Sequence, residues 1–145
     1  MTPYLVVLLA GALVAIQTSF FSLIHKGLKH PLLSLSAIFF IAAIFVLIGF
    51  CLQPSALPDK QTLAHIPWYA WLGGILGVAY VTCVMTLAPK MGIAMITVTS
   101  VLGQLIASML IDHFGLFGTA AQPISIGKLL GIAVMTTGVA LMKFF

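Results

Sequence analysis

Residues 31–52 read PLLSLSAIFFIAAIFVLIGFCL and contain no charged side chain. The hydrocarbon core of a bilayer is about 30 Å thick, and a helix that rises about 1.5 Å per residue crosses it in about 20 residues. Pro31 suits the start of such a helix, because its missing N–H would have no partner in the first turn. This run is therefore long enough and apolar enough to cross a membrane as one helix.

The rest of the chain has the same composition. Of its 145 residues, 62% are hydrophobic and only 6% are charged, namely six lysines and two aspartates. An average globular protein has roughly 25% charged residues. This chain has too little polar surface for a water-soluble fold and is too apolar to be disordered. We therefore predict a polytopic membrane protein, embedded in the lipid bilayer, with no extramembrane domain.

Prolines, glycines and basic clusters divide the chain into five predicted spans. Inside a bilayer every backbone polar group needs an internal partner, which a helix supplies. We predict an all-α integral membrane protein in which residues 1–145 form a single membrane domain. The predicted spans are residues 3–24, 31–52, 67–88, 93–111 and 124–145.

The lysines predict the orientation of these spans. An odd number of spans places the termini on opposite sides of the membrane. The N-terminus, the 53–67 loop and the 112–123 connector share one side, which carries Lys60 and, at its edge, Lys128. The side with more lysines faces the cytoplasm in most membrane proteins. The other side carries four lysines, which predicts a cytoplasmic C-terminus and an outside N-terminus: Lys26, Lys29, Lys90 and Lys143.

Several classes of function are disfavoured. The lysines are scattered and arginine is absent, which argues against nucleic-acid binding. No Ser-His-Asp set or carboxylate pair lies within a predicted span, so we expect neither an enzyme nor a cofactor. All four histidines fall in predicted loops without metal-ligand spacing, so no metal site is predicted. They are His25, His30, His65 and His113.

Two glutamines lie inside predicted spans, Gln17 in the first and Gln104 in the fourth. An amide in hydrocarbon is costly unless it is paired. Thr97, Ser100, Gln104 and Ser108 follow one another at intervals of three or four residues, which places them on one side of a helix. This pattern indicates either a polar wall of a substrate cavity or hydrogen bonds between helices.

Small residues occur at helical spacing in two spans. Gly73 and Gly77 in the third span, and Gly127 and Gly131 in the fifth, form small-xxx-small pairs. Such pairs let helix backbones approach closely, so we predict packing within the chain or between chains. Tyr80 lies on the same helix side as Gly77. It is a candidate for stacking on a substrate, and the alternative is a hydroxyl bonded within the helix bundle.

Asp112 is the one acid next to a predicted span, at the C-terminal end of the fourth helix. A carboxylate there faces the negative end of the helix dipole. The sequence leaves several interpretations open. Asp112 caps the segment that follows, pairs with a lysine, lines a vestibule, or is simply hydrated.

Two longer stretches resemble a known family. Residues 67–81 read PWYAWLGGILGVAYV and residues 103–115 read GQLIASMLIDHFG, and the last span adds KLLG at 128–131 together with Gly138. The chain resembles the YdcZ-type short inner-membrane proteins of the drug/metabolite transporter superfamily. The resemblance covers essentially the whole chain and is strongest from Pro67 onward. The first span departs from the family pattern at Phe21, where an asparagine would be expected.

The resemblance implies a transporter or exporter of a small metabolite or toxic organic compound in the bacterial inner membrane. It also implies a five-helix unit that is half of a ten-helix transporter. A second copy or a paralogue in the opposite orientation would complete it, and alternating access would occur around a central site. The candidate substrate-binding residues are Gln17, Tyr80, Ser100 and Gln104, and Asp112 is a candidate coupling or vestibule residue. The alternative is a non-transporting structural or regulatory subunit, which would need no water-accessible polar cavity at mid-membrane.

Overall fold

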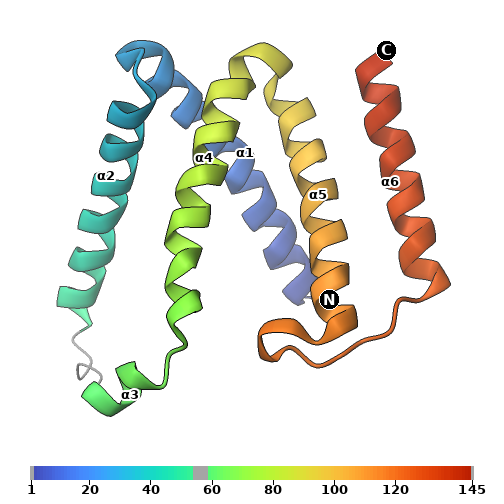
Figure 1. The fold of residues 1–145 in the computed structure, drawn as a ribbon. Coiled ribbons are helices and arrows are strands. Elements are labelled where there is room, and N and C mark those ends of the chain that lie inside the picture. The colour runs from blue at the N-terminus through green and yellow to red at the C-terminus, as the bar shows by residue number, and fades with distance from the viewer. Residues whose placement is uncertain (1, 54–58, 145) are drawn as a thin grey trace. The chain divides into compact units, whose positions relative to one another are not determined.

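The computed structural model describes residues 2–53 and 59–144, which contain helices and no strand (Figure 1). Five helical segments in these ranges are long and apolar enough to cross a membrane. The predicted all-α membrane class with five spans is therefore confirmed. They are α1 (Thr2–Leu28), α2 (Pro31–Leu52), η1 with α4 (Trp68–Trp71 and Leu72–Met91), α5 (Ile93–Phe114) and α6 (Ile126–Phe144). The chain forms two compact units, Met1–Lys90 and Met91–Phe145.

In the first unit, a tight turn joins α1 to α2, and the two helices pack against each other. Lys29 adopts a positive φ of 53°, and its N–H donates to the carbonyl of His25 at 2.9 Å. His30 caps α2, because its Nδ1 accepts a hydrogen bond from the N–H of Leu33 at 3.4 Å. Pro31 lies in the first turn of α2, as the sequence predicts.

The core of the first unit lies where α1, α2 and α4 meet. Leu35 and Ile38 of α2 and Met85 of α4 are buried together. Phe21 and Ile24 of α1 pack against this cluster, as does Val81 of α4. The cluster is small, and most large apolar side chains on the helices are exposed. Exposed apolar faces are what a bilayer or a second protein chain would cover.

The helix α4 runs further than the sequence predicts. Its expected end at Ala88 and the expected turn over residues 89–92 are wrong, because α4 continues to Met91 with Pro89 inside it. A proline near the end of a membrane helix removes one N–H and leaves the rest of the helix intact. Gly92 breaks the helix with a φ of 85°, which favours glycine, and α5 begins at Ile93 as predicted.

The predicted loop between α2 and α4 contains a short helix. Residues 54–58 of that loop lie outside the described residues, whereas Lys60–Ala64 form α3. Asp59 caps α3, since its Oδ1 accepts from the N–H of Thr62 at 2.8 Å and from the Thr62 hydroxyl at 2.5 Å. The predicted loop is therefore wrong over Lys60–Ala64, because the proline-rich composition gave no signal of this capped turn.

Two further boundaries differ at α1 and α5. The helix α1 extends to Leu28 instead of residue 24, and α5 extends to Phe114 instead of residue 111. His25 and His113 therefore lie within helices. The prediction that they lie in loops is wrong. Among the described atoms, His25 Nδ1 is buried without a hydrogen-bond partner. The predicted ends were too early because polar side chains indicate where a helix leaves the hydrocarbon core. The backbone hydrogen bonds of the helix continue beyond that point.

The second unit consists of α5, a folded connector and α6, and α5 packs against α6. Gly115 ends α5 in the left-handed conformation, with a φ of 61°, and the short helix η2 (Leu116–Gly118) follows. The helix α6 begins at Ile126 and not at residue 124, because Ser125 is its cap. The Ser125 hydroxyl oxygen accepts from the N–H of Lys128 at 3.3 Å. Nothing within Ile126–Phe144 is buried.

Candidate functional site

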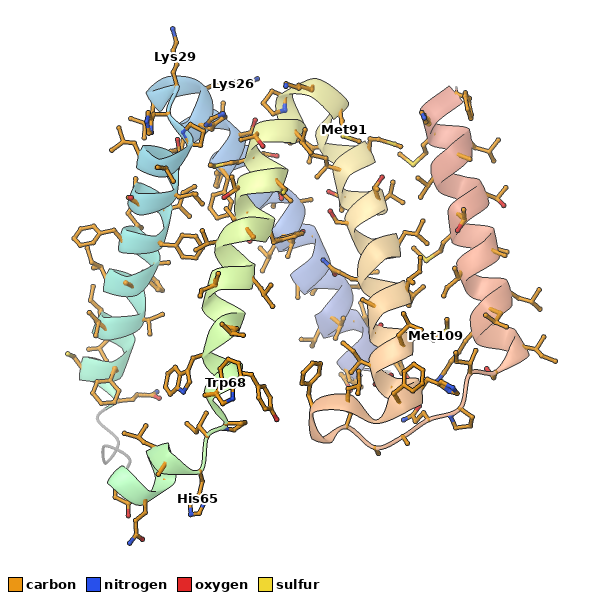
Figure 2. All side chains as sticks on the ribbon, in the orientation of Figure 1. Lys26, Lys29, His65, Trp68, Met91 and Met109 are labelled. Carbon is orange, nitrogen blue, oxygen red and sulfur yellow. The ribbon has the colours of Figure 1, made fainter. Side chains whose placement is uncertain are left out.

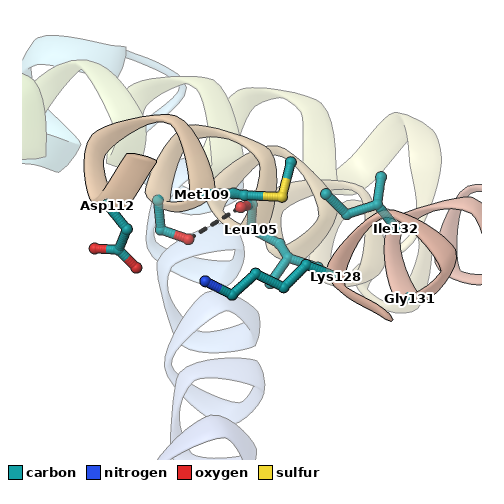
Figure 3. A pocket seen from close by; sticks show the side chains of 7 residues that line it. Leu105, Met109, Asp112, Lys128, Gly131 and Ile132 are labelled. Carbon is teal, nitrogen blue, oxygen red and sulfur yellow. Dashed lines mark hydrogen bonds between the residues drawn. The ribbon is translucent and has the colours of Figure 1, made fainter. Parts of the chain in front are cut away.

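A cavity of about 250 Å³ lies between α5 and α6, within the second unit (Figure 3). The helices run antiparallel here, so the last turns of α5 face the first turns of α6. The wall is mainly apolar and carries three polar groups, the hydroxyl of Ser108, the carboxylate of Asp112 and the ammonium of Lys128. The remaining lining residues are Leu105, Met109, Gly131 and Ile132.

Asp112 and Lys128 each lie at the end of their own helix that disfavours their charge. Asp112 is in the last turn of α5, near the negative end of its dipole, and Lys128 is in the first turn of α6, near the positive end. Because the two helices are antiparallel neighbours, each charge lies beside the end of the other helix that favours it. The antiparallel pairing therefore offsets the unfavourable position that each side chain has on its own helix.

The two charged side chains share the cavity without forming a salt bridge in the described part of the chain. The Nζ of Lys128 donates instead to Oε1 of Gln122, at a long distance of 3.5 Å. A carboxylate and an ammonium that do not neutralise each other by direct contact can both interact with a bound molecule. The cavity therefore offers one group of each charge on an otherwise apolar wall.

The connector fixes the backbone beside Asp112. The carbonyl of Asp112 accepts from the N–H of Gln122 at 2.7 Å and from the N–H of Gly115 at 3.3 Å. Gly115 also fits closely against the returning chain, because a Cβ there would lie 3.3 Å from both the Thr119 carbonyl oxygen and the Ala121 Cβ. The connector thus holds the end of α5 in a defined conformation.

The predicted polar stripe of α5 separates into two kinds of residue. The hydroxyls of Thr97 and Ser108 donate to their own helix, to Ile93 O at 2.8 Å and to Leu105 O at 3.0 Å. Ser100 is half-buried and Gln104 is exposed, and neither side chain has a hydrogen-bond partner in the described part of their unit. Ser100 and Gln104 therefore keep their hydrogen-bonding capacity for another molecule.

The stripe also continues into the cavity. Ser108 follows Gln104 by four positions, and Asp112 follows Ser108 by another four, so all three lie along one side of α5. Ser108 and Asp112 both line the cavity. Asp112 follows the last residue of the predicted stripe, Ser108, by the same four positions. It was left out of the stripe because the predicted span ended at residue 111. Lys128 was missed as a site residue because only the fold brings it opposite Asp112.

The candidates Gln17 and Tyr80 lie in the first unit. Gln17 is exposed on α1, and Tyr80 is 41% exposed on α4. The buried polar residues of α1 are Thr18 and Ser22 instead. Thr18 donates its hydroxyl to the carbonyl of Val14 at 2.9 Å. Neither the Gln17 amide nor the Tyr80 hydroxyl has a partner within the described residues of its unit, so both stay candidates for contact with a substrate or another chain.

The four glycines predicted to mediate packing make no close helix contact within their own units. An added Cβ would meet no atom within 4 Å at Gly73, Gly77 or Gly131, and at Gly127 it would meet only Ser125 Oγ at 3.9 Å. Their packing role stays a prediction, for contact with another chain. Gly131 has a second consequence, because it lines the cavity and its missing side chain leaves that volume open.

The residues that line the cavity suit an organic molecule and not a metal ion. Within residues 2–53 and 59–144, no three histidine, cysteine or acidic side chains gather closely enough to hold a metal ion. Cys51 and Cys83 are free and exposed. An apolar wall with a few placed polar groups is the usual form of a small-molecule site.

The comparisons with known proteins agree with the resemblance seen in the sequence. The profile of the family described as "Putative inner membrane exporter, YdcZ" matches residues 2–141. That range includes α1 to α5 in full and most of α6. Neither a curated protein nor a solved structure matches the chain.

Proposed function

The chain belongs to the YdcZ family of inner membrane exporters, and on this basis we propose that it exports a small organic molecule through the cavity between α5 and α6. It is a multi-pass inner membrane protein, and its described residues include five helices able to span the bilayer. Membership of an exporter family favours transport over catalysis. The observation that carries the proposal is that Asp112 and Lys128 share one cavity without neutralising each other in a salt bridge.

The cavity sets limits on the substrate. Its volume of about 250 Å³ is just below the roughly 300–1,000 Å³ of drug-sized pockets, so it suits a small molecule. Asp112 attracts a positive group and Lys128 attracts a negative one, while Leu105 and Ile132 contact apolar parts. A compact molecule with a polar or zwitterionic group and an apolar body fits this wall best.

Polar groups that lead away from the cavity support a transport route. Gln104 and Ser100 continue the line of Ser108 and Asp112 toward the middle of α5 and have no hydrogen-bond partner within their unit. In the proposal, the substrate passes from the Asp112 vestibule to these two side chains. Gln17 and Tyr80 of the first unit are separate candidates for substrate contact, and protonation of Asp112 is the candidate coupling step.

A single chain supplies five spans, and we propose that two copies, or one copy and a paralogue, assemble in opposite orientations. Inverted halves around a central site are a common plan for alternating access. The absence of buried residues on α6 supports an interface there, since this helix leaves its apolar side chains uncovered within the second unit.

Crosslinking in native membranes tests this assembly. After Cys51 and Cys83 are replaced by alanine, one cysteine is placed at Leu129 and another at Ala140, which lie on the same side of α6 near its opposite ends. Inverted copies that meet along this side of α6 crosslink residue 129 to residue 140. Parallel copies crosslink each position to itself, which would contradict the inverted arrangement. No self-crosslink at either position points to a paralogous partner.

A cavity-filling substitution tests the transport proposal. Because a Cβ at Gly131 meets nothing within 4 Å, Gly131→Leu should fold and fill the cavity. Gly138→Leu is the matched control, since it adds the same side chain to α6 outside the cavity wall and also has open space.

The readout is mass spectrometry of the culture medium from cells that overproduce each variant. At least one small molecule should accumulate with the parent protein and with Gly138→Leu, and not with Gly131→Leu. If the medium never differs from that of cells without the protein, the non-transporting subunit becomes the better interpretation. If both leucine variants export equally, the α5–α6 cavity is not the route.

A further inference from the structure

A second concave site lies on the first unit, beside the turn that joins α1 to α2. It is an open groove of about 430 Å³ lined by Leu28, Leu33, Ser36, Ala37 and Phe40. The one polar side chain, Ser36, donates its hydroxyl to the carbonyl of Leu32 at 2.9 Å and so presents little free polarity. The groove is therefore an almost entirely apolar depression on α2, next to the end of α1.

Two lysines flank Leu28, the residue that α1 contributes to this groove. Lys26 lies in the last turn of α1, and Lys29 follows Leu28 in the turn to α2; Figure 2 shows both at this end of the helices. Lys29 is held in the left-handed region, with a φ of 53°, by the bond from its N–H to the His25 carbonyl. The positive end of the α2 dipole lies at the same place, because α2 begins at Pro31. Two ammonium groups and a helix start thus face the same interface.

No carboxylate of the first unit balances this charge. Its one acid is Asp59, which follows the other end of α2. With 22 residues, α2 is about 33 Å long, so Asp59 and the turn belong to opposite membrane interfaces. At an ionic strength of about 0.1 M, charges that far apart in water are screened from each other.

We propose that this site binds one anionic phospholipid, with its headgroup phosphate on Lys26 and Lys29 and one acyl chain in the groove. Lipid tails are as apolar as the groove, so the tail contact by itself distinguishes no lipid from another. The lysines supply the preference, because a basic cluster at a membrane interface attracts anionic lipid by roughly fivefold for each lysine. This proposal is independent of the exported substrate.

Fluorescence quenching by brominated lipid tests the site. The protein is made with Trp68→Phe and Trp71→Phe, and a reporter tryptophan replaces Phe40 in the groove. The control reporter replaces Phe45, which lies on the same helix, is 79% exposed and does not line the groove. Both proteins are placed in phosphatidylcholine vesicles that contain a minor fraction of brominated phosphatidylglycerol or brominated phosphatidylcholine.

The groove reporter should be quenched several-fold more by brominated phosphatidylglycerol than by brominated phosphatidylcholine. The Phe45 reporter should show no such preference. Lys26→Gln with Lys29→Gln should remove the preference, while Lys143→Gln, which removes one lysine from the other unit, should leave it unchanged. Equal quenching by the two lipids in the groove overturns the proposal.

A test without substitution of the lysines covers the case in which the double variant does not fold. Raising the salt concentration from about 0.1 M to 1 M shortens the screening length from about 10 Å to about 3 Å. The phosphatidylglycerol preference of the groove reporter should fall with salt. A preference that survives 1 M salt would show that the lysines do not hold the headgroup and would contradict the proposed site.

Discussion

Asp112 of α5 and Lys128 of α6 line the same cavity, and each is placed against the dipole of its own helix. Either charge by itself would destabilise its helix end. The antiparallel pairing of α5 with α6 adds a favourable interaction for each charge, since each then lies beside the end of the neighbouring helix whose dipole has the opposite sign. Within the described residues, the two side chains are therefore related by this reciprocal placement and not by a direct salt bridge.

This arrangement predicts a measurable coupling between the two residues. In a double-mutant cycle with Asp112→Asn and Lys128→Gln, the effects on the free energy of unfolding should not add. The coupling should be about 0.5–1 kcal/mol, as for a partly exposed charge pair. The measurement is denaturant or thermal unfolding in detergent of the parent, both single variants and the double variant. Strict additivity would mean that the two charges do not sense each other.

Gly115 should be more sensitive to substitution than the glycines inside the helices of the second unit. A non-glycine residue in the left-handed conformation costs about 1–2 kcal/mol, and Gly115 has a φ of 61°. A Cβ there would also lie 3.3 Å from the Thr119 carbonyl oxygen. Gly115→Ala should therefore lower the melting temperature measured by circular dichroism.

Gly118→Ala is the control that separates these two causes. Gly118 has a φ of 82° but open space around its Cβ, so its substitution adds only the conformational cost. Gly115→Ala should lower the melting temperature more than Gly118→Ala does. Equal losses would show that the contact between Gly115 and the returning connector adds nothing.

The helices could be predicted from the sequence because their signal is averaged over about 20 apolar residues. Their ends depend on single contacts and were less predictable. Pro89 stands inside α4 because one lost hydrogen bond is tolerated there, and Gly92 supplies the break instead. At α6, the Ser125 cap moved the start to Ile126.

The candidate site was half predictable. The spacing of Ser100, Gln104 and Ser108 indicated one polar side of α5, and the structure leaves Ser100 and Gln104 without partners in their unit. Lys128 could not be found in the same way, because its relation to Asp112 arises only when α6 folds back against α5. A contact between residues on different helices has no spacing signal in a single sequence.

Gln104 should contribute to export through its unpaired amide. A neutral hydrogen bond to a substrate is worth about 0.5–1.5 kcal/mol, so Gln104→Ala should lower the export rate by roughly two- to thirteenfold. The measurement is the appearance rate of the exported molecule in the medium at matched protein levels. Gln61→Ala, which truncates the same amide on α3, is the control. Unchanged export by Gln104→Ala would remove this residue from the proposed route.

Asp59 predicts a pH dependence at the start of α3. The hydrogen bonds from Thr62, first from its hydroxyl and then from its N–H, lower the pKa of the Asp59 carboxyl below its ordinary value of 3.8. A carboxyl with a lowered pKa in the folded state stabilises that state fully above the ordinary value. The stabilisation disappears as the pH falls through the lowered value.

Nuclear magnetic resonance of the Thr62 amide proton should report this step as a change in chemical shift at acidic pH. Thr62→Val removes the hydroxyl donor and should move the midpoint upward, toward 3.8. Asp59→Asn should remove the step. A midpoint that does not move in Thr62→Val would show that this hydroxyl does not contribute to the cap.

The lysine distribution predicts how the chain inserts. Four lysines fall on the side of the C-terminus against two on the other, so most chains should place the N-terminus outside and the C-terminus in the cytoplasm. Reporters active on only one side of the membrane, fused in turn to each terminus, measure this. Lys26→Gln with Lys90→Gln removes the excess and should produce both orientations, because the two sides then carry equal numbers of lysines. Parent chains with only cytoplasmic N-termini would contradict the predicted orientation, while a mixture in the parent would let identical copies form the proposed inverted pair.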